Sequence, residues 1–369
     1  MKKRFLKDIA EIQTGPFGSQ LHKEDYVDVG TPIVTVEHLG SRVFSEQNLP
    51  MVSDTDKRRL SKYILKKGDI VFSRVGSVDR CSFVDKKHDG WMFSGRCLRV
   101  RPSEKVDSLF LYYFFCLNTT KEFVRSIAVG ATMSSINTKL LGEVEVVCPE
   151  IEEQRKIADI LSKIDDKIEE NLKINENLQQ QAQAIYCDMF ITNVNPSWQL
   201  GRLSDLITVR YGKDHKKLAD GIYPVYGSGG IMRYVEKPLY DKESVLIPRK
   251  GTLNNVMYVN KPFWSVDTMF FTEMKLPNVA KFVFHFVKSK DLASLNTGSA
   301  VPSMTTDILN AMELSIPDAN TFYKFENIVA PLYQAMQQNT QESSKLAELR
   351  DSLLPRLMSG EIDVTDIDL

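Results

Sequence analysis

The chain has 369 residues and a net charge of −1, and 43% of its residues are hydrophobic while 26% are charged. This composition is that of an ordinary globular protein, and the length predicts two or more domains rather than one hydrophobic core. Apolar runs shorter than ~18 residues, a basic start without an apolar signal core, and five scattered cysteines without a C-x-x-C pair argue against a membrane span, secretion and a zinc site. We therefore expect a cytoplasmic protein without membrane association and without a cofactor.

Residues 1–149 alternate short strands with turns, and the apolar stretch 109–115 predicts a buried helix, so we expect an α+β globular domain. Three loops, 15–19, 74–77 and 130–135, contain glycine and small polar residues or place a cation after a strand. Such loops suit backbone and hydroxyl contacts with DNA, and ordinary turn chemistry is the alternative for each. The candidate DNA-binding residues are Phe17, Ser19, Arg74, Ser77, Thr132, Ser134 and Ser135.

Residues 150–191 are expected to form one long helix. Acidic residues crowd its first turn, where the helix dipole favours them, and neither Gly nor Pro interrupts 150–190. One column of residues recurs every seven positions, and a second column follows four residues behind it. The two columns contain Ile157, Ile164, Asn171, Leu178 and Ile185, and Leu161 and Ile168. This heptad spacing predicts one apolar seam on a helix about 60 Å long, whereas the run Asp165-Asp166-Lys167 is expected to face solvent.

Residues 197–317 are expected to form a second α+β globular domain, in which the apolar stretch 280–286 again predicts a buried helix. Its loops around 226–230 and 249–252 resemble the loops of the first domain in composition, and a basic cluster occupies 213–217. The glycine-rich loops do not match a Walker phosphate-binding pattern. The candidate DNA-binding residues are Lys213, Lys216, Lys217, Ser228, Arg249, Lys250, Thr252, Ser299 and Ser303.

Residues 318–360 are expected to form a second long helix, followed by a tail at 361–369. Its heptad column contains Phe325, Leu332, Asn339, Leu346 and Leu353. Pro331 and Pro355 are each expected to bend the helix or to mark a turn near its end, and Gly360 is a plausible stop.

The two halves of the chain repeat one another. A shift of 168 residues places Gly130 on Gly298 and Pro149 on Pro317, and it continues through both predicted helices. Earlier segments match with other offsets, so that Gly15 aligns with Gly212 and 70–76 aligns with 245–251. Chance alignment of common residues is the alternative, but the matching order is kept along the whole chain. A period this long predicts a duplicated module of one domain and one helix rather than a solenoid.

The simplest partner for the seam of one predicted helix is the other helix. Antiparallel packing would form a coiled coil that separates the two domains, with an internal pseudo-twofold axis. Equivalent positions near the middle of the helices would then meet, so we expect Asn171 and Asn339 to lie close together and to fix the register. Two solvent-facing asparagines are the alternative.

Charge alternates along the repeat. Residues 1–150 contain 23 Lys and Arg against 19 Asp and Glu, and 197–317 contain 15 against 11, so each has a net charge of +4. The helical segments are acidic, with 5 against 9 in 151–196 and 4 against 9 in 318–369. Basic domains suit DNA phosphate and acidic helices suit protein partners, although ordinary fluctuation could produce differences of this size.

Two segments resemble a known family. Residues 149–161, Pro-Glu-Ile-Glu-Glu-Gln-Arg-Lys-Ile-Ala-Asp-Ile-Leu, look like the first shared helix of Type I restriction–modification specificity subunits. Residues 349–361, Leu-Arg-Asp-Ser-Leu-Leu-Pro-Arg-Leu-Met-Ser-Gly-Glu, are similar to the end of the second helix. With the duplicated layout, the resemblance covers essentially the whole chain. At the repeat position of Glu153-Gln154 the second copy has Thr321-Phe322, so the contacts of the second helix could differ.

The resemblance implies a non-catalytic DNA-recognition subunit. It implies two target-recognition domains that each read half of a split double-stranded DNA sequence, two methyltransferase subunits around the coiled coil, and restriction and translocase subunits in a larger assembly. The sequence lacks the N-P-P-[FY], G-x-G-x-x-G and H-E-x-x-H motifs. Three alternatives remain: a homodimeric coiled-coil scaffold, a DNA-binding protein without methyltransferase partners, and an enzyme with an unrecognised site in the glycine-rich loops.

Overall fold

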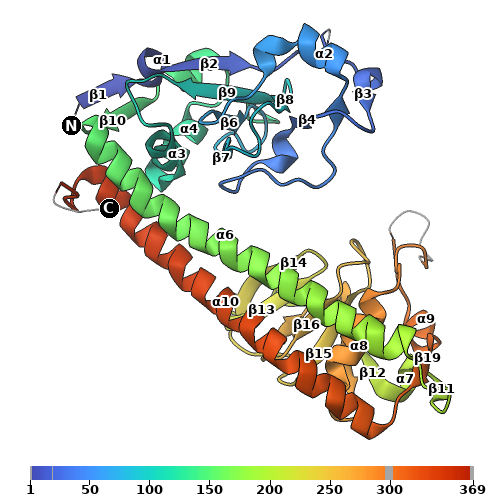
Figure 1. The fold of residues 1–369 in the computed structure, drawn as a ribbon. Coiled ribbons are helices and arrows are strands. Elements are labelled where there is room, and N and C mark those ends of the chain that lie inside the picture. The colour runs from blue at the N-terminus through green and yellow to red at the C-terminus, as the bar shows by residue number, and fades with distance from the viewer. Residues whose placement is uncertain (1, 19, 296–301, 366–369) are drawn as a thin grey trace. The chain divides into compact units, whose positions relative to one another are not determined.

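The computed structural model describes residues 2–18, 20–295 and 302–365, which cluster into two compact units (Figure 1). Unit 1 contains Met1–Asn171 and Gln341–Leu369, and unit 2 contains Leu172–Thr340. Each of the two long helices, α6 (Ile151–Cys187) and α10 (Ala319–Ser359), contributes one part to each unit. Within the described residues, no helix combines the length and the apolarity that a membrane span requires.

Unit 1 contains three small sheets. The strands β1 (Lys2–Phe5) and β10 (Glu145–Cys148) form an antiparallel pair. A four-stranded antiparallel sheet has the order β2 (Ala10–Thr14), β9 (Cys97–Pro102), β6 (Ile70–Ser73) and β7 (Cys81–Phe83). The third sheet has the order β3 (Tyr26–Val27), β5 (Met51–Val52), β4 (Thr31–Val34) and β8 (Met92–Phe93), and its β4–β8 pair is parallel.

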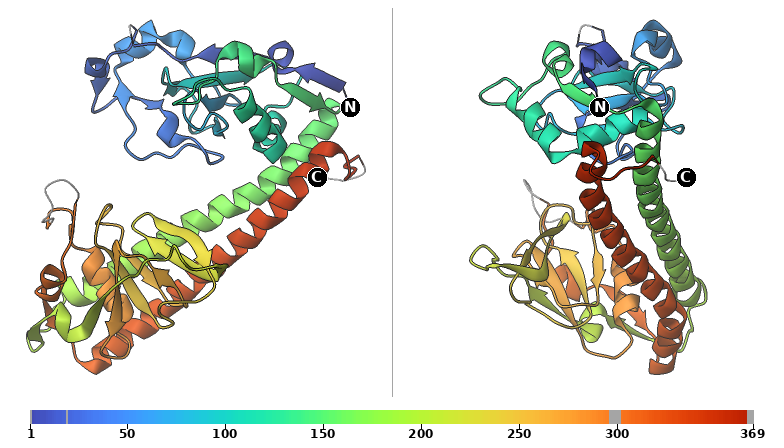
Figure 2. Two further views of the ribbon diagram at one scale, coloured as in Figure 1. Left: turned by 180° about the vertical axis from the view of Figure 1, so that it is seen from behind. Right: turned by 90° about the vertical axis from the view of Figure 1, so that its left-hand side faces the viewer.

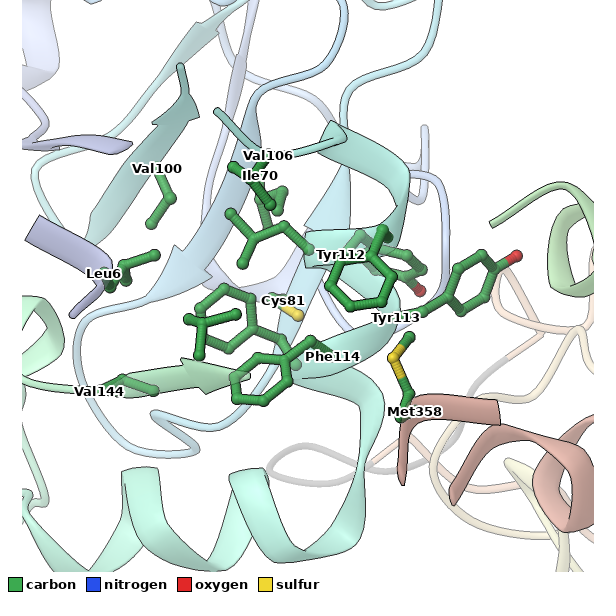
Figure 3. Packing of buried hydrophobic residues seen from close by; sticks show 14 of the residues in the cluster. Leu6, Ile70, Cys81, Val100, Val106, Tyr112, Tyr113, Phe114, Val144 and Met358 are labelled. Carbon is green, nitrogen blue, oxygen red and sulfur yellow. The ribbon is translucent and has the colours of Figure 1, made fainter. Parts of the chain in front are cut away.

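The main core of unit 1 surrounds the helix α3 (Ser108–Cys116), which is apolar on all sides and therefore suited to full burial. The Asp107 side chain begins this helix by accepting from the backbone N–H groups of Leu109 and Phe110. Figure 3 shows its aromatic side chains packed between the sheet and Met358 of α10. The remaining helical segments of unit 1 are α1 (Leu6–Ile9), η1 (Lys23–Asp25), η2 (Val36–His38), α2 (Asp54–Arg59), η3 (Ser61–Tyr63), α4 (Asn118–Ser126) and α5 (Thr138–Gly142).

Unit 2 repeats this plan. The strands β11 (Gln199–Arg202) and β19 (Glu313–Ile316) form an antiparallel pair. A four-stranded antiparallel sheet has the order β12 (Ile207–Tyr211), β18 (Met269–Met274), β15 (Ser244–Pro248) and β16 (Met257–Val259). The third sheet has the order β14 (Gly230–Val235), β13 (Asp220–Gly227) and β17 (Trp264–Ser265), with β13 and β17 parallel. Its helical segments besides α6 and α10 are η4 (Asp188–Thr192), α7 (Leu203–Leu206), α8 (Ala280–Lys288) and α9 (Thr306–Asn310).

The matching strand orders confirm the predicted duplication and the α+β class of both domains. Strand β2 corresponds to β12, β9 to β18, β6 to β15 and β7 to β16, and each copy encloses its buried helix, α3 or α8, in its core. Helix α10 continues through Pro331 and Pro355 rather than ending at either residue. It ends before Gly360, whose φ of 76° is the left-handed conformation expected of a glycine stop.

In each unit, parts of α6 and α10 pack side by side in antiparallel directions, as Figure 2 shows for both views. In unit 1, Ile157 and Leu161 of α6 share a core with Leu357 of α10. In unit 2, Tyr186 of α6 shares a core with Phe325 of α10. Within unit 1 residue 165 contacts 350 and residue 171 contacts 342, so the numbering of one helix falls as that of the other rises.

Candidate nucleic-acid interface

Two of the predicted loops of unit 1 meet directly at one end of the four-stranded sheet. Val75, just after β6, forms an antiparallel bridge with Ser135. The backbone N–H of Gly76 donates to the carbonyl of Ser134 at 2.8 Å, and the N–H of Ile136 donates to the carbonyl of Arg74 at 2.9 Å. The loop 74–77 and the loop 130–135 therefore form one backbone-linked surface.

Arg74 joins the third loop to this surface. Its Nη1 donates to the carbonyl of Gly95 at 3.1 Å, and its guanidinium lies 5.2 Å from the centroid of the Phe17 ring. Phe17 is 53% exposed, so the ring and the guanidinium present a shared face to solvent. Gly15 allows this approach, because a Cβ there would lie 2.1 Å from the carbonyl oxygen of Ser94.

Unit 2 builds the same arrangement around Arg249. Its Nη1 donates to the carbonyl of Asp267 at 3.0 Å, and its guanidinium lies 5.4 Å from the centroid of the Tyr211 ring. Lys250 forms an isolated antiparallel bridge with Ser303, and the N–H of Met304 donates to the carbonyl of Arg249 at 2.9 Å. We call these two surfaces the first and second arginine loop clusters, centred on Arg74 and Arg249.

Two further predicted residues lie at the second cluster. The Asn255 side chain donates to the carbonyl of Ser228 at 2.8 Å, and a Cβ added to Gly251 would lie 2.9 Å from the Ser228 hydroxyl. The backbone N–H of Lys213 donates at 2.8 Å to the carbonyl of Ser265, the last residue of β17 and two residues before Asp267. The loops 226–230 and 249–252 are therefore in contact.

Five other predicted residues have exposed side chains, three on the loops that form the clusters and two beside the second cluster. They are Ser77, Thr132, Lys216, Lys217 and Thr252. Two predicted residues, Ser19 and Ser299, lie outside the described residues.

Sequence reasoning did not identify the carbonyl anchors or the aromatic partner in unit 2. Gly95 lies in the turn before β9, and Asp267 lies in the matching turn before β18. Nothing in either residue type indicates that its carbonyl accepts from the arginine. Tyr211 immediately precedes Gly212, whereas Phe17 follows Gly15 by two residues. The aromatic residue near each matched glycine is the sequence feature that could have identified the ring beside each arginine.

The clusters also contain exposed apolar side chains that sequence reasoning did not select. Met133 is 62% exposed in the first cluster loop 130–135, and Met232 is 60% exposed on β14. Met232 lies over Gly227, because a Cβ at that glycine would be 2.5 Å from the Met232 sulfur. Apolar side chains at a DNA-facing surface can contact thymine methyl groups in the major groove.

The predicted helix-seam residues are buried to different degrees. Ile157, Leu161, Asn171 and Phe325 are buried, and Ile164, Ile168, Leu178, Ile185, Leu332, Asn339, Leu346 and Leu353 are half-buried. Asn171 Nδ2 donates to Glu342 at 2.8 Å within unit 1, and Asn339 Nδ2 donates to Asn175 at 2.9 Å within unit 2. The expected proximity of Asn171 and Asn339 to each other stays a prediction.

One expectation for the first helix is wrong. Asp165 was expected to face solvent, but it is buried. Its carboxylate accepts from the Tyr113 hydroxyl at 2.7 Å and from Arg350 Nη1 at 2.7 Å, and these two partners replace water. Burial and the neighbouring Asp165 charge raise the pKa of Tyr113, which keeps its proton available for donation. Arg42 adds a second connection by donating to Glu169 at 2.9 Å and by pairing with Asp166.

Unit 2 fixes its domain to the helices through a buried histidine. His285 of α8 contacts Gln183 of α6 through Nδ1 at 2.8 Å and Tyr333 of α10 through Nε2 at 2.9 Å. Burial, with a smaller effect of the Lys288 charge, lowers the pKa of His285 to about 3. The imidazole is therefore neutral, with Nδ1 donating to the Gln183 oxygen and Nε2 accepting from the tyrosine.

The repeat position of Gln154 also differs between the copies. Gln154 accepts from the backbone N–H of Asp107 at 2.9 Å and donates to the carbonyl of Pro149 at 2.9 Å, so it ties the start of α6 to its own domain. Phe322, its counterpart, is buried and packs against Phe282 with ring centroids 5.0 Å apart. Both side chains thus serve contacts inside their own units. Across the described ranges, no three His, Cys, Asp or Glu side chains are grouped to hold a metal ion.

Comparison with known proteins gives a consistent result. A family model described as "Type I restriction modification DNA specificity domain" matches residues 1–180 and 195–349. The Type I restriction enzyme MjaIX specificity subunit of Methanocaldococcus jannaschii is 23% identical, over 98% of this chain and 93% of that protein. The Type I restriction enzyme HindI specificity subunit of Haemophilus influenzae is 22% identical, over 82% of this chain and 88% of that protein. The crystal structure of a Type-I restriction-modification system S subunit from M. genitalium has the same fold, with a TM-score of 0.58 and 19% identity over 96% of this chain and 95% of that one.

Proposed function

Because the chain belongs to the Type I restriction modification DNA specificity family, whose role is sequence-specific DNA recognition, we propose that each unit reads one half of a split DNA target. The first arginine loop cluster reads one half and the second arginine loop cluster reads the other, with unread bases between the halves. The chain is a recognition subunit, and it leaves the chemistry to its partners.

The repeated arginine site is the observation that carries this proposal. Arg74 and Arg249 occupy the same position after matched strands, donate to matched turns, and lie over exposed aromatic rings. A guanidinium has five N–H donors, so each arginine keeps donors for DNA after its one internal bond. The stacked ring and the carbonyl hold the group in a fixed orientation, which favours bidentate contact with guanine or with phosphate.

Lysines near the second cluster add a weaker, sequence-independent term. Lys213 and Lys250 have exposed side chains on loops that meet at Arg249. Cations of this kind neutralise phosphates and release counterions, so the affinity falls as salt rises. Base selection then depends on the loop side chains that reach into the major groove.

The proposal includes protein partners. Two methyltransferase subunits would bind the helical segments and modify adenine after flipping it into their own pocket, and restriction and translocase subunits would join a larger assembly. The acidic character of 151–196 and 318–369 suits contacts with proteins and disfavours contacts with DNA phosphate.

Selection from random double-stranded DNA by the chain assembled with its methyltransferase subunit tests the proposal. We expect enrichment of two short fixed motifs separated by a constant number of unspecified bases. A single continuous motif would contradict the division of reading between the units. Assembly without enrichment of any sequence would favour the scaffold alternative instead.

A further inference from the structure

Unit 1 contains a cavity that the DNA-reading role does not use. It has a volume of about 850 Å³ and lies where β1, the end of β9 and the start of α6 meet. Residues 66–69, which line it, precede β6, whereas Arg74 follows that strand. Arg101 lines it from the end of β9, whereas Gly95 of the first arginine loop cluster precedes that strand. The cavity and the cluster are therefore at opposite ends of one sheet.

The cavity is strongly basic. Seven of its lining residues are Lys or Arg, and four are Asp or Glu. Asp69 is already engaged, because Arg101 donates to both of its carboxylate oxygens at 2.7 and 2.6 Å. Among the described residues, no carboxylate lies within ion-pair distance of Arg4, Lys66 or Lys67. These three cations are available for an external anion.

The second copy lacks most of these cations. The strand registers, the matched segments 70–76 and 245–251, and the helix repeat align the positions of the two units. In unit 2 the positions that match Lys2, Arg4, Lys66, Arg101 and Arg155 contain Gln199, Gly201, Asp241, Glu273 and Tyr323. Five of the seven cations are thus replaced by three neutral residues and two acids, whereas Lys67 is matched by Lys242. A surface needed for reading DNA would be expected in both copies, so this cavity serves a task performed once per chain.

The lining favours carboxylates over phosphate as the bound anion. Phosphate sites commonly use free N–H groups at a helix start. At the start of α3 the Asp107 side chain already accepts from Leu109 and Phe110, and at the start of α6 the lining includes the carboxylate of Glu150. The forked guanidinium of Arg101 is engaged by Asp69, and that of Arg155 donates to Glu152 at 2.6 Å. What remains is Arg4 and flexible lysines. They stand beside carboxylates that would repel a polyphosphate more than an isolated acidic side chain. Among the described residues that line the cavity, none is aromatic and Gly68 is the single glycine, which does not suit a nucleotide base or its phosphates.

We propose that this cavity binds an acidic segment of a partner protein, at one copy per chain. The inference rests on the proposed function in one respect, namely that the chain works with protein partners. It adds that the two units are not equivalent toward those partners, because unit 2 lacks five of the cations that line the cavity of unit 1. One partner subunit, or one segment of it, is therefore held on the side of unit 1.

The first test uses the full-length chain and a fluorescein-labelled hexaglutamate peptide, followed by anisotropy at low salt. The variant Lys66→Glu/Lys67→Glu reverses two exposed charges whose side chains form no hydrogen bond or ion pair within the described residues. The matched control Lys237→Glu/Lys242→Glu reverses two exposed lysine charges in unit 2. We expect at least tenfold weaker peptide binding for the first variant and less than a twofold change for the control. Equal weakening in both would overturn the proposal, as would tripolyphosphate binding more tightly than the peptide.

The second test uses the assembled complex and a carbodiimide, which joins lysine to a carboxylate only at ion-pair range. We expect cross-links from Lys66 or Lys67 to Asp or Glu of a partner subunit. Cross-links from other lysines of the chain to the partner, with none from these two, would overturn the proposal. Selection of a split DNA motif is measured separately, so a failed cross-link with a retained motif rejects this inference and leaves the proposed function standing.

Discussion

The two units fix their domains to the helices through the same pair of positions, but with opposite chemistry. In unit 1 the domain residue Tyr113 donates to the helix residue Asp165, and in unit 2 the helix residue Tyr333 donates to the domain residue His285. The repeat matches 113 with 285 and 165 with 333, so the hydrogen bond is kept while donor and acceptor exchange places. Unit 1 depends on a buried charge and Arg350, whereas the buried contact of unit 2 is neutral.

This comparison shows that a duplicated fold preserves the place of a contact more strictly than the residues that make it. A buried polar group must be paired, and either partner can supply the proton. Once the copies are joined in one chain, each copy can therefore acquire a different pair of residues for this contact. The units should consequently respond differently to loss of charge and to pH.

Removal of the unit 1 carboxylate should have the largest effect on stability. Asp165→Ala leaves Arg350 and Tyr113 without their buried acceptor, and we expect a loss of about 3 kcal/mol in the unfolding free energy of unit 1. Hydrogen exchange followed by mass spectrometry resolves the two units. Asp351→Ala removes the exposed second partner of Arg350 and is the matched control, expected to cost less than about 1 kcal/mol. Equal losses in the two variants would show that the buried charge is not decisive.

Acid should weaken unit 2 through His285. The folded pKa of about 3 lies below the ordinary value of 6.5, so the unfolded state binds the proton first as pH falls. Stability from this group is present above pH 6.5 and is lost below it, by about 2 kcal/mol between pH 7 and pH 5. Exchange rates in α8 measured across this range check the prediction. The variant His285→Gln should have a flatter pH dependence there, and an unchanged slope would reject the assignment.

The matched glycines Gly15 and Gly212 should respond alike to substitution, because the two copies have the same close backbone contact at this position. A Cβ at Gly15 would lie 2.1 Å from the carbonyl oxygen of Ser94, and one at Gly212 would lie 2.0 Å from that of Val266. Each substitution by Ala should cost about 1–2 kcal/mol in its own unit, because the backbone must shift. Gly18→Ala and Gly229→Ala are the controls, since a Cβ at either position meets nothing within 4 Å. Denaturant midpoints compare the four variants, and a control as costly as its partner would contradict this reading.

The sequence contained enough information to predict the layout but not the contacts that join its parts. Hydrophobic spacing and repetition identified two α+β domains, two long helices, and the paired loops around Arg74 and Arg249. The helix pattern predicted that Asp165 faces solvent, because a carboxylate is normally solvated. Its contacts with Tyr113 and Arg350 form only when the chain is folded. The Tyr211 and Asp267 contacts of Arg249 likewise join segments far apart in the chain, and no local pattern encodes such distances.

The central claim is that each unit reads its own half of the DNA target. DNA selection by the assembled complex, repeated with Arg74→Ala and with Arg249→Ala, tests it most directly. We expect each variant to bind about tenfold more weakly and to relax the sequence of one half only, with Arg74 and Arg249 affecting different halves. Relaxation of both halves by either variant, or of neither half by both, would contradict the account.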